Sequence, residues 1–89
     1  MISEKEKNII IELAKKYNVK RIILFGSASK ATNDNRDIDL AVEGLPDNLF
    51  FKFYSELIFN LSLPVDLIDL NKRSRFTEIV VSEGVLLYG

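Results

Sequence analysis

The apolar residues near the N-terminus recur at the spacing of a helix. They are Ile10, Leu13, Ala14 and Tyr17, with charged residues between them. This pattern predicts a helix over residues 3–17. Ser3 is placed to cap the first turn and Glu6 follows three residues later, which predicts a capping box in which the glutamate reaches back to the serine.

Shorter apolar runs with a different pattern predict strands. Residues 20–25 end in an unbroken β-branched and aromatic run, typical of a strand buried on both faces. Residues 37–42 alternate acidic and apolar positions, which predicts one buried face and one face that carries carboxylates. Residues 65–70 predict a third strand, and the apolar residues 85–88 can add a fourth.

Two further helices are expected between and after these strands. One opens at Pro46-Asp47 and ends before Pro64, and three of its aromatic residues lie beyond its core stripe. These are Phe51, Tyr54 and Phe59. Asn71 or Ser74 can cap a last helix, which ends at Gly84 in the C′ position. A short helical turn over residues 28–31 completes the predicted order, α-β-(α)-β-α-β-α, of an α/β (α+β) protein.

Length and composition narrow the classes of protein that this chain can be. Its 89 residues predict one domain, residues 1–89, and 47% hydrophobic content supports a core. A formal net charge of -1 gives no basic field for nucleic acid or a membrane, so no direct binding to either is expected. The chain has no cysteine and no histidine, which excludes disulfides and imidazole catalysis within it. Its charged N-terminus predicts neither a signal peptide nor a membrane span, so a cytoplasmic location is expected.

Three aspartates carry the candidate chemistry. Asp37 and Asp39 are two residues apart in a predicted strand, so their side chains share a face. Two carboxylates at such a short distance raise each other's pKa unless a cation neutralises them. Asp66 on a later strand would complete an all-oxygen site of the kind that Mg²⁺ prefers. Gly26 and Ser27 offer close backbone approach and a hydroxyl group for a phosphate, so the pattern predicts metal-dependent phosphate chemistry on a nucleotide.

A simpler interpretation is that Asp37 and Asp39 are solvated residues at a strand end. Asp66 argues against it, because a lone carboxylate in an otherwise apolar strand is costly unless it is paired or bound to a metal. Glu43 continues the same face and Asp69 lies on the opposite face. We interpret both as surface or turn residues.

These residues resemble a known family. Gly26-Ser27, then Asp37-Ile38-Asp39, then Asp66 are similar to the motif of the minimal nucleotidyltransferases (MNT) of the DNA polymerase β-like superfamily. Many of these are partners of HEPN proteins in prokaryotic toxin–antitoxin pairs. The resemblance covers nearly the whole chain. It implies the nucleotidyltransferase fold, a small mixed β-sheet with helices packed on one side.

The resemblance also implies roles for individual residues. Asp37 and Asp39 would bind two Mg²⁺ ions shared with the triphosphate of ATP, and Asp66 would complete the site and accept a proton. Gly26 and Ser27 would hold the distal phosphates, with Lys30 at the position of an arginine that is frequent in the family. Lys30 cannot grip a phosphate in the bidentate way of arginine. Arg36 stands where the family often has a small polar residue, and the loop between Ser27 and Asp37 is shorter than in these antitoxins.

Three functions are then compared. The first is an adenylyltransferase that moves AMP to a hydroxyl of a helical HEPN-type partner, since a chain this short can hardly enclose the acceptor by itself. The second is a binding antitoxin that acts by occlusion with a weak or vestigial nucleotide site. The three aspartates favour the first, while Lys30, Arg36 and the short loop leave the second open. The third is a nucleotidyltransferase that acts on small molecules. This function is not favoured, because such acceptors require an extra domain that the 89 residues do not include.

Overall fold

A computed structural model describes residues 2–26 and 37–89 of the chain. The helical turn predicted over residues 28–31 lies outside this part. The elements are α1 (Glu4–Lys16), β1 (Arg21–Phe25), β2 (Ile38–Glu43), α2 (Asp47–Asn60), β3 (Val65–Asp69), α3 (Arg75–Glu83) and β4 (Val85–Tyr88). They confirm the predicted fold class and the predicted sequence of helices and strands within the described residues.

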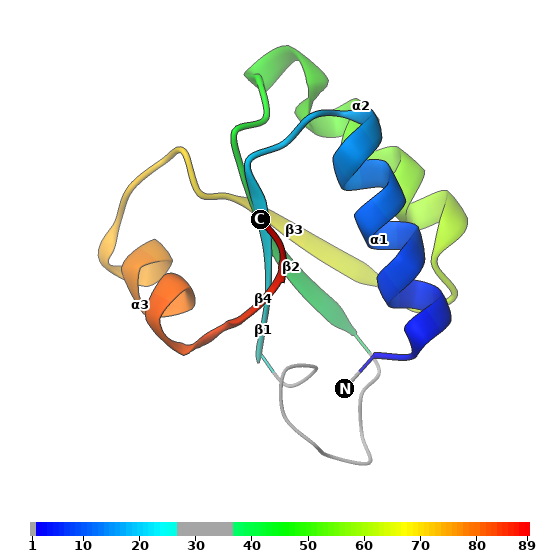
Figure 1. The fold of residues 1–89 in the computed structure, drawn as a ribbon. Coiled ribbons are helices and arrows are strands. Elements are labelled where there is room, and N and C mark those ends of the chain that lie inside the picture. The colour runs from blue at the N-terminus through cyan, green and yellow to red at the C-terminus, as the bar shows by residue number, and fades with distance from the viewer. Residues whose placement is uncertain (1, 27–36) are drawn as a thin grey trace.

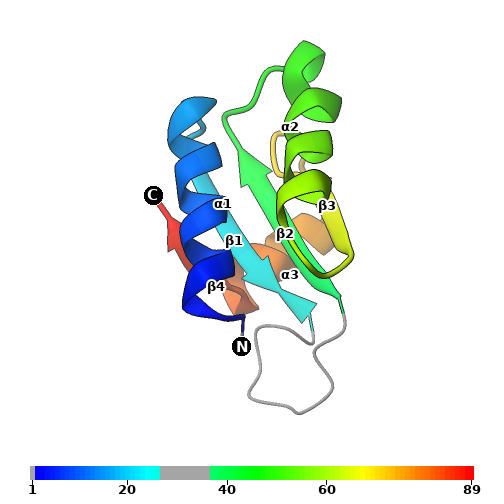
Figure 2. The same ribbon diagram turned by 90° about the vertical axis from the view of Figure 1, so that its right-hand side faces the viewer.

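The four strands form one mixed sheet in the order β3-β2-β1-β4. β1 runs antiparallel to β2 and to β4, whereas β2 and β3 are parallel. The end of β1 and the start of β2 therefore lie at the same end of the sheet, where Phe25 pairs with Asp39 (Figure 2). The parallel pair places the start of β3 at that end as well.

Helices cover both faces of the sheet, and not only one face as the resemblance implies. Figure 1 shows α1 and α2 on one side of the sheet and α3 on the other. The larger core lies under α1 and α2, where Ile10 and Phe53 pack against strand residues such as Leu24. On the other face, Val80 of α3 packs against Ile23 and other apolar strand residues. The reason lies in β1, whose consecutive apolar residues offer one hydrophobic surface to each side.

Ser3 caps the first turn of α1. The Ser3 hydroxyl accepts from the Glu6 backbone N–H at 3.2 Å, as predicted. The Glu6 carboxylate, however, accepts from the Ser62 backbone N–H at 3.3 Å. Because Glu6 is buried against the loop after α2, it ties the two helices together there, and it is not engaged in the predicted reciprocal bond.

Gly84 ends α3, as the C-cap residue and not at the predicted C′ position. Its φ is −79°, so the residue is extended and not left-handed. A Cβ atom at this position would overlap the side chain of Ile23. The glycine is therefore needed for the close approach of α3 to β1, and the short turn into β4 follows directly.

The aromatic residues of α2 separate into buried and exposed ones. Phe53 is fully buried, whereas Phe51 and Phe59 are 77% and 87% exposed. Tyr54 was predicted to lie outside the core with them, and this is wrong. Its ring packs against the core, and its hydroxyl donates to the Val65 backbone carbonyl at 2.8 Å, which anchors α2 to the start of β3.

Candidate functional site

Parallel pairing of β2 and β3 brings two of the three predicted aspartates together. Asp39 and Asp66 are direct neighbours across the two strands. Asp37 lies two residues before Asp39, immediately ahead of β2. Side chains two apart on a strand share a face, so all three belong to the face that carries α3. The fold therefore places Asp37, Asp39 and Asp66 near one another at one end of the sheet, and their role as metal ligands stays a prediction.

The electrostatics of Asp39 reflect this crowding. Burial is the largest cause that raises the pKa of Asp39, and the charges of Asp66 and Asp37 raise the pKa further. A side-chain hydrogen bond with Asp66 adds to the shift. The three groups are thus close enough to act on one another, and their mutual repulsion is the condition that a bound cation relieves.

The donor set fits a hard divalent cation in chemistry. The three side chains offer only carboxylate oxygens, which suit Mg²⁺. Within residues 2–26 and 37–89, no three acidic side chains are arranged to ligate a common ion as they stand. Because the pKa of Asp39 is raised, its protonated form is favoured, and a bound ion would take the place of that proton.

The premise that Asp66 is buried is wrong. Asp66 is exposed, because β3 is an edge strand and α3 packs mainly against β1. The apolar residues of β3, such as Val65 and Leu67, face the α1–α2 layer instead. Burial of Asp66 therefore gives no argument for a metal site. The observation that supports such a site is the direct pairing of Asp66 with Asp39.

Gly26 forms a wall of the same site. It follows Phe25, the partner of Asp39 across β1 and β2, and its φ is +72°, a conformation that favours glycine. A Cβ atom on Gly26 would overlap the Asp39 carboxylate. The absence of a side chain thus leaves room for the carboxylate at the end of β1. Ser27, Lys30 and Arg36 lie outside the described residues, so their roles stay predictions.

A groove beside Gly26 was not found from the sequence. It has a volume of about 240 Å³ and is lined by residues from the end of β1 and from α3. Phe76 and Ile79 of α3 line it and are 54% and 47% exposed. Their position on the flank of α3 toward Gly26 became visible only with the fold.

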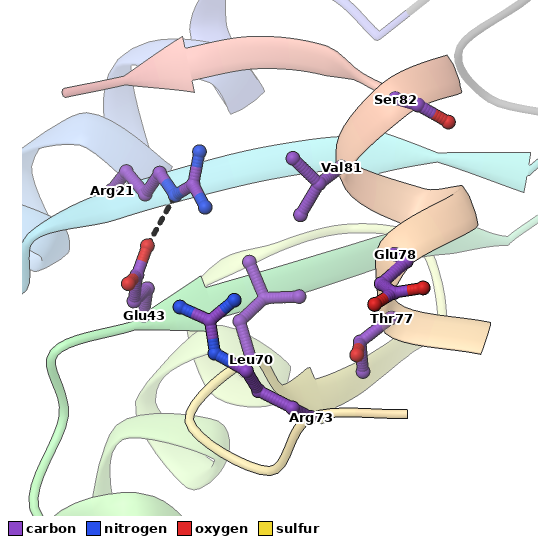
Figure 3. A pocket seen from close by; sticks show the side chains of 8 residues that line it. All are labelled: Arg21, Glu43, Leu70, Arg73, Thr77, Glu78, Val81 and Ser82. Carbon is purple, nitrogen blue, oxygen red and sulfur yellow. Dashed lines mark hydrogen bonds and ion pairs between the residues drawn. The ribbon is translucent and has the colours of Figure 1, made fainter. Parts of the chain in front are cut away.

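A second pocket of about 180 Å³ lies under α3 at the opposite end of the sheet (Figure 3). Arg21 and Arg73 contribute positive charge to it. The Glu43 carboxylate is already paired with Arg21 and lies 3.9 Å from the Lys20 ammonium. Glu43 is thus a half-buried ion-pair residue and not the predicted surface residue. Since Asp37, Asp39 and Asp66 are not among its lining residues, this pocket is separate from the carboxylate site.

Replacement of Asp66 by asparagine is expected to leave the metal-free fold as stable as wild type, or more stable by up to about 1 kcal/mol. Like charges placed directly across two strands are destabilising, and the change removes one of them. The raised pKa of Asp39 sets the pH dependence. The stability from its bound proton is complete below the ordinary aspartate pKa and is lost as pH rises through the raised pKa. Asp66→Asn should reduce this loss. Thermal melts in chelator across pH 3–7 measure it.

Asp69→Asn is the matched control for this experiment. It removes one negative charge from the same strand, and Asp69 accepts from the Asn71 backbone N–H at 2.9 Å, a role that an asparagine oxygen can keep. No stabilisation is expected from it. A large loss of stability in Asp66→Asn alone would show that Asp66 is a structural group held by hydrogen bonds.

Comparison with known proteins gives one consistent result. A family model described as polymerase beta, nucleotidyltransferase, matches residues 7–89. No curated protein sequence is significantly similar to the chain.

Three solved structures add detail. A chain from the crystal structure of a toxin–antitoxin with AMP-PNP is 32% identical, with 93% of this chain and 73% of that chain covered and a TM-score of 0.76. A chain from the toxin–antitoxin MntA-HepT is 29% identical, with coverages of 98% and 73% and a TM-score of 0.74. A chain from the tri-AMPylated Shewanella oneidensis HEPN toxin in complex with MNT antitoxin is 31% identical, with coverages of 94% and 70% and a TM-score of 0.72.

Proposed function

Because this chain belongs to the polymerase beta nucleotidyltransferase family, we propose that it transfers AMP from ATP to a hydroxyl group of a partner protein. The partner is a HEPN-type toxin, and the chain acts as its MNT-type antitoxin. The observation that carries the proposal is the pairing of Asp39 with Asp66, with Asp37 two residues before Asp39. The similarity to a toxin–antitoxin structure with AMP-PNP and to one with a tri-AMPylated HEPN toxin supports the same reaction.

The residues have distinct parts in this reaction. Asp37 and Asp39 would hold Mg²⁺, with Asp66 completing the donor set, and the bound ions would supply charge neutralisation for the triphosphate and a lowered pKa for the attacking hydroxyl. The hydroxyl oxygen of the acceptor forms a bond to the α-phosphorus, and the bond from that phosphorus to pyrophosphate breaks. The exposed carboxylate of Asp66 accepts the hydroxyl proton. Gly26 offers backbone close to the distal phosphates, with Ser27 and Lys30 as their further ligands.

The experiment is intact-mass spectrometry of the HEPN-type partner after incubation with this chain, ATP and Mg²⁺. The expected result is a mass increase by one or more AMP units, which chelator prevents. If the partner's activity is blocked without any AMP adduct, the chain is an antitoxin that acts by occlusion. If there is neither an adduct nor a block, the proposal is wrong.

The exposed rings on α2 are the proposed contact with the partner. Phe51 and Phe59 are two turns apart on one side of the helix, with Ile58 also exposed beside them. Large exposed apolar side chains gathered on one surface are typical of protein interfaces. This surface lies on the side of the sheet opposite the carboxylates, so a partner bound there must reach around the sheet edge, or a second partner molecule must supply the acceptor.

We expect Phe51→Ala and Phe59→Ala each to weaken the complex about ten-fold. Truncation of an aromatic anchor at the centre of an interface costs about 1–3 kcal/mol, and 1.4 kcal/mol is a factor of ten. Binding of a Mg²⁺–ATP analogue should be unchanged in both. Leu86→Ala removes an exposed apolar side chain from β4 and is the matched control for complex formation. Calorimetry of the chain with the purified partner measures the affinity of the complex. Unchanged affinity in both α2 variants would show that this surface is not part of the interface.

A further inference from the structure

The groove between α3 and the end of β1 has the composition of a site for a flat, aromatic ligand. Its α3 wall consists of Phe76, Ile79 and Glu83, which recur at helical spacing and therefore share one flank. Phe25 and Gly26 form the opposite wall. The surface is mainly apolar, with one carboxylate at its rim. Ligand sites commonly combine an apolar lining with a few polar groups that fix orientation.

The ring of Phe76 is held in place yet open to a ligand. It meets the ring of Phe25 in an edge-to-face contact, with centroids 6.0 Å apart and planes at 80°. Phe76 is nevertheless 54% exposed, although the hydrophobic core lies directly beneath α3. A fixed and exposed ring can stack on a planar group with little loss of side-chain entropy.

The groove adjoins the carboxylate site, although none of the three aspartates lines it. Gly26 lines the groove and also abuts the Asp39 carboxylate, and Phe25 is the strand partner of Asp39. A molecule with phosphates at the carboxylates therefore has this groove within reach of its other end. In a nucleotide, that other end is the base.

We propose that the groove binds the adenine base of the nucleotide, with the base stacked on Phe76 and its amino group donating to Glu83. This inference rests on the proposed function. The Glu83 carboxylate only accepts hydrogen bonds, and the amino group of adenine is a donor. A base with a carbonyl oxygen at that position would set two acceptors against each other. Phe76 thus supplies affinity for any base, and Glu83 supplies the preference for the amino group.

Binding measurements with three ligands separate these roles. Calorimetry uses the full chain with Mg²⁺ and, in turn, a non-hydrolysable ATP analogue, the triphosphate of unsubstituted purine riboside, and inorganic tripolyphosphate. Phe76→Ala should weaken the binding of both nucleotides about ten-fold, as expected for the loss of one base–aromatic stack. The affinity for tripolyphosphate should not change. Phe76→Trp should restore nucleotide affinity. Glu83→Ala should weaken the binding of the ATP analogue several-fold and leave the affinity for the purine riboside triphosphate unchanged.

Val81→Ala is the matched control on α3. Val81 is exposed and lines the pocket on the other flank of the helix, so its truncation should change none of the three affinities. The restoration by tryptophan excludes a merely structural effect of Phe76→Ala, because a destabilised α3 would not regain affinity from a larger ring.

The outcomes distinguish this inference from the proposed function. If wild type binds neither the ATP analogue nor tripolyphosphate, nucleotide binding itself is absent and the proposed function falls with the inference. If wild type binds the ATP analogue and Phe76→Ala binds it equally well, the groove does not hold the base, and only the inference is wrong. Weaker complex formation with the HEPN-type partner, together with unchanged nucleotide affinity, would make the groove a protein interface.

Discussion

Replacement of Asp39 by asparagine is expected to lower AMP transfer about a thousand-fold. Asp39 is the central carboxylate, because it pairs with Asp66 across the strands and because the charge of Asp37 raises its pKa. Its loss removes one of the charges that would hold the ions, whose stabilisation of transition-state charge is worth several kcal/mol. A thousand-fold loss corresponds to about 4 kcal/mol, since each 1.36 kcal/mol is a factor of ten. Single-turnover transfer from labelled ATP to the partner measures it.

The complex with the partner should still form in Asp39→Asn, because the proposed contact surface is on the other side of the sheet. Asp69→Asn again serves as the control, since it removes the same charge from a residue that is occupied with the Asn71 backbone. It should keep transfer within about two-fold of wild type. Asp39→Asn with transfer within ten-fold of wild type would mean that the aspartates do not carry the chemistry.

The local structure followed closely from the sequence. Helical spacing of apolar residues and a serine cap fix α1, and the acidic–apolar alternation of β2 already places Asp37 and Asp39 on one face. These features depend on neighbours within a turn or a strand. The pairing of Asp66 with Asp39 is different, because it depends on how β2 and β3 align, and no local pattern states that register.

The wrong predictions share this cause. Asp66 was assumed to be buried, since an apolar strand looks the same whether it lies at the centre or at the edge of a sheet. Tyr54 was expected outside the core stripe, but its hydroxyl donates a hydrogen bond to the Val65 carbonyl, on the strand that follows α2. Gly84 was assigned to the C′ position of a helix end, whereas its close packing on Ile23 explains the need for glycine. In each case a distant segment decides the environment.

The groove beside Gly26 was missed for a related reason. Phe76 and Ile79 carry the same apolar signal as the buried Val80, and helical spacing alone does not tell which flank is covered. The signal that could have suggested the groove is Glu83, a carboxylate on the same flank as two apolar residues. Only the position of α3 beside the end of β1 makes that flank one wall of a groove.

Replacement of Gly26 by alanine is expected to lower AMP transfer about a hundred-fold and to destabilise the fold by about 1–3 kcal/mol. The backbone at Gly26 has a φ of +72°, which strains any residue with a Cβ atom. The added Cβ would also overlap the Asp39 carboxylate, so the carboxylate must move. Displacement of a reacting group by about 1 Å can cost a factor of 10² in rate. Transfer per folded molecule and a denaturant melt measure the two effects.

Gly44→Ala separates the effect on the site from the strain itself. Gly44 has a similar φ of +86°, and an added Cβ would lie 2.7 Å from the Lys20 backbone nitrogen. It follows β2 at the end of the strand away from Asp39. We therefore expect Gly44→Ala to lose comparable stability while each folded molecule transfers AMP at the wild-type rate. Equal loss of transfer in both variants would show that the rate responds to the stability of the sheet, and that the close fit of Gly26 against Asp39 has no role of its own.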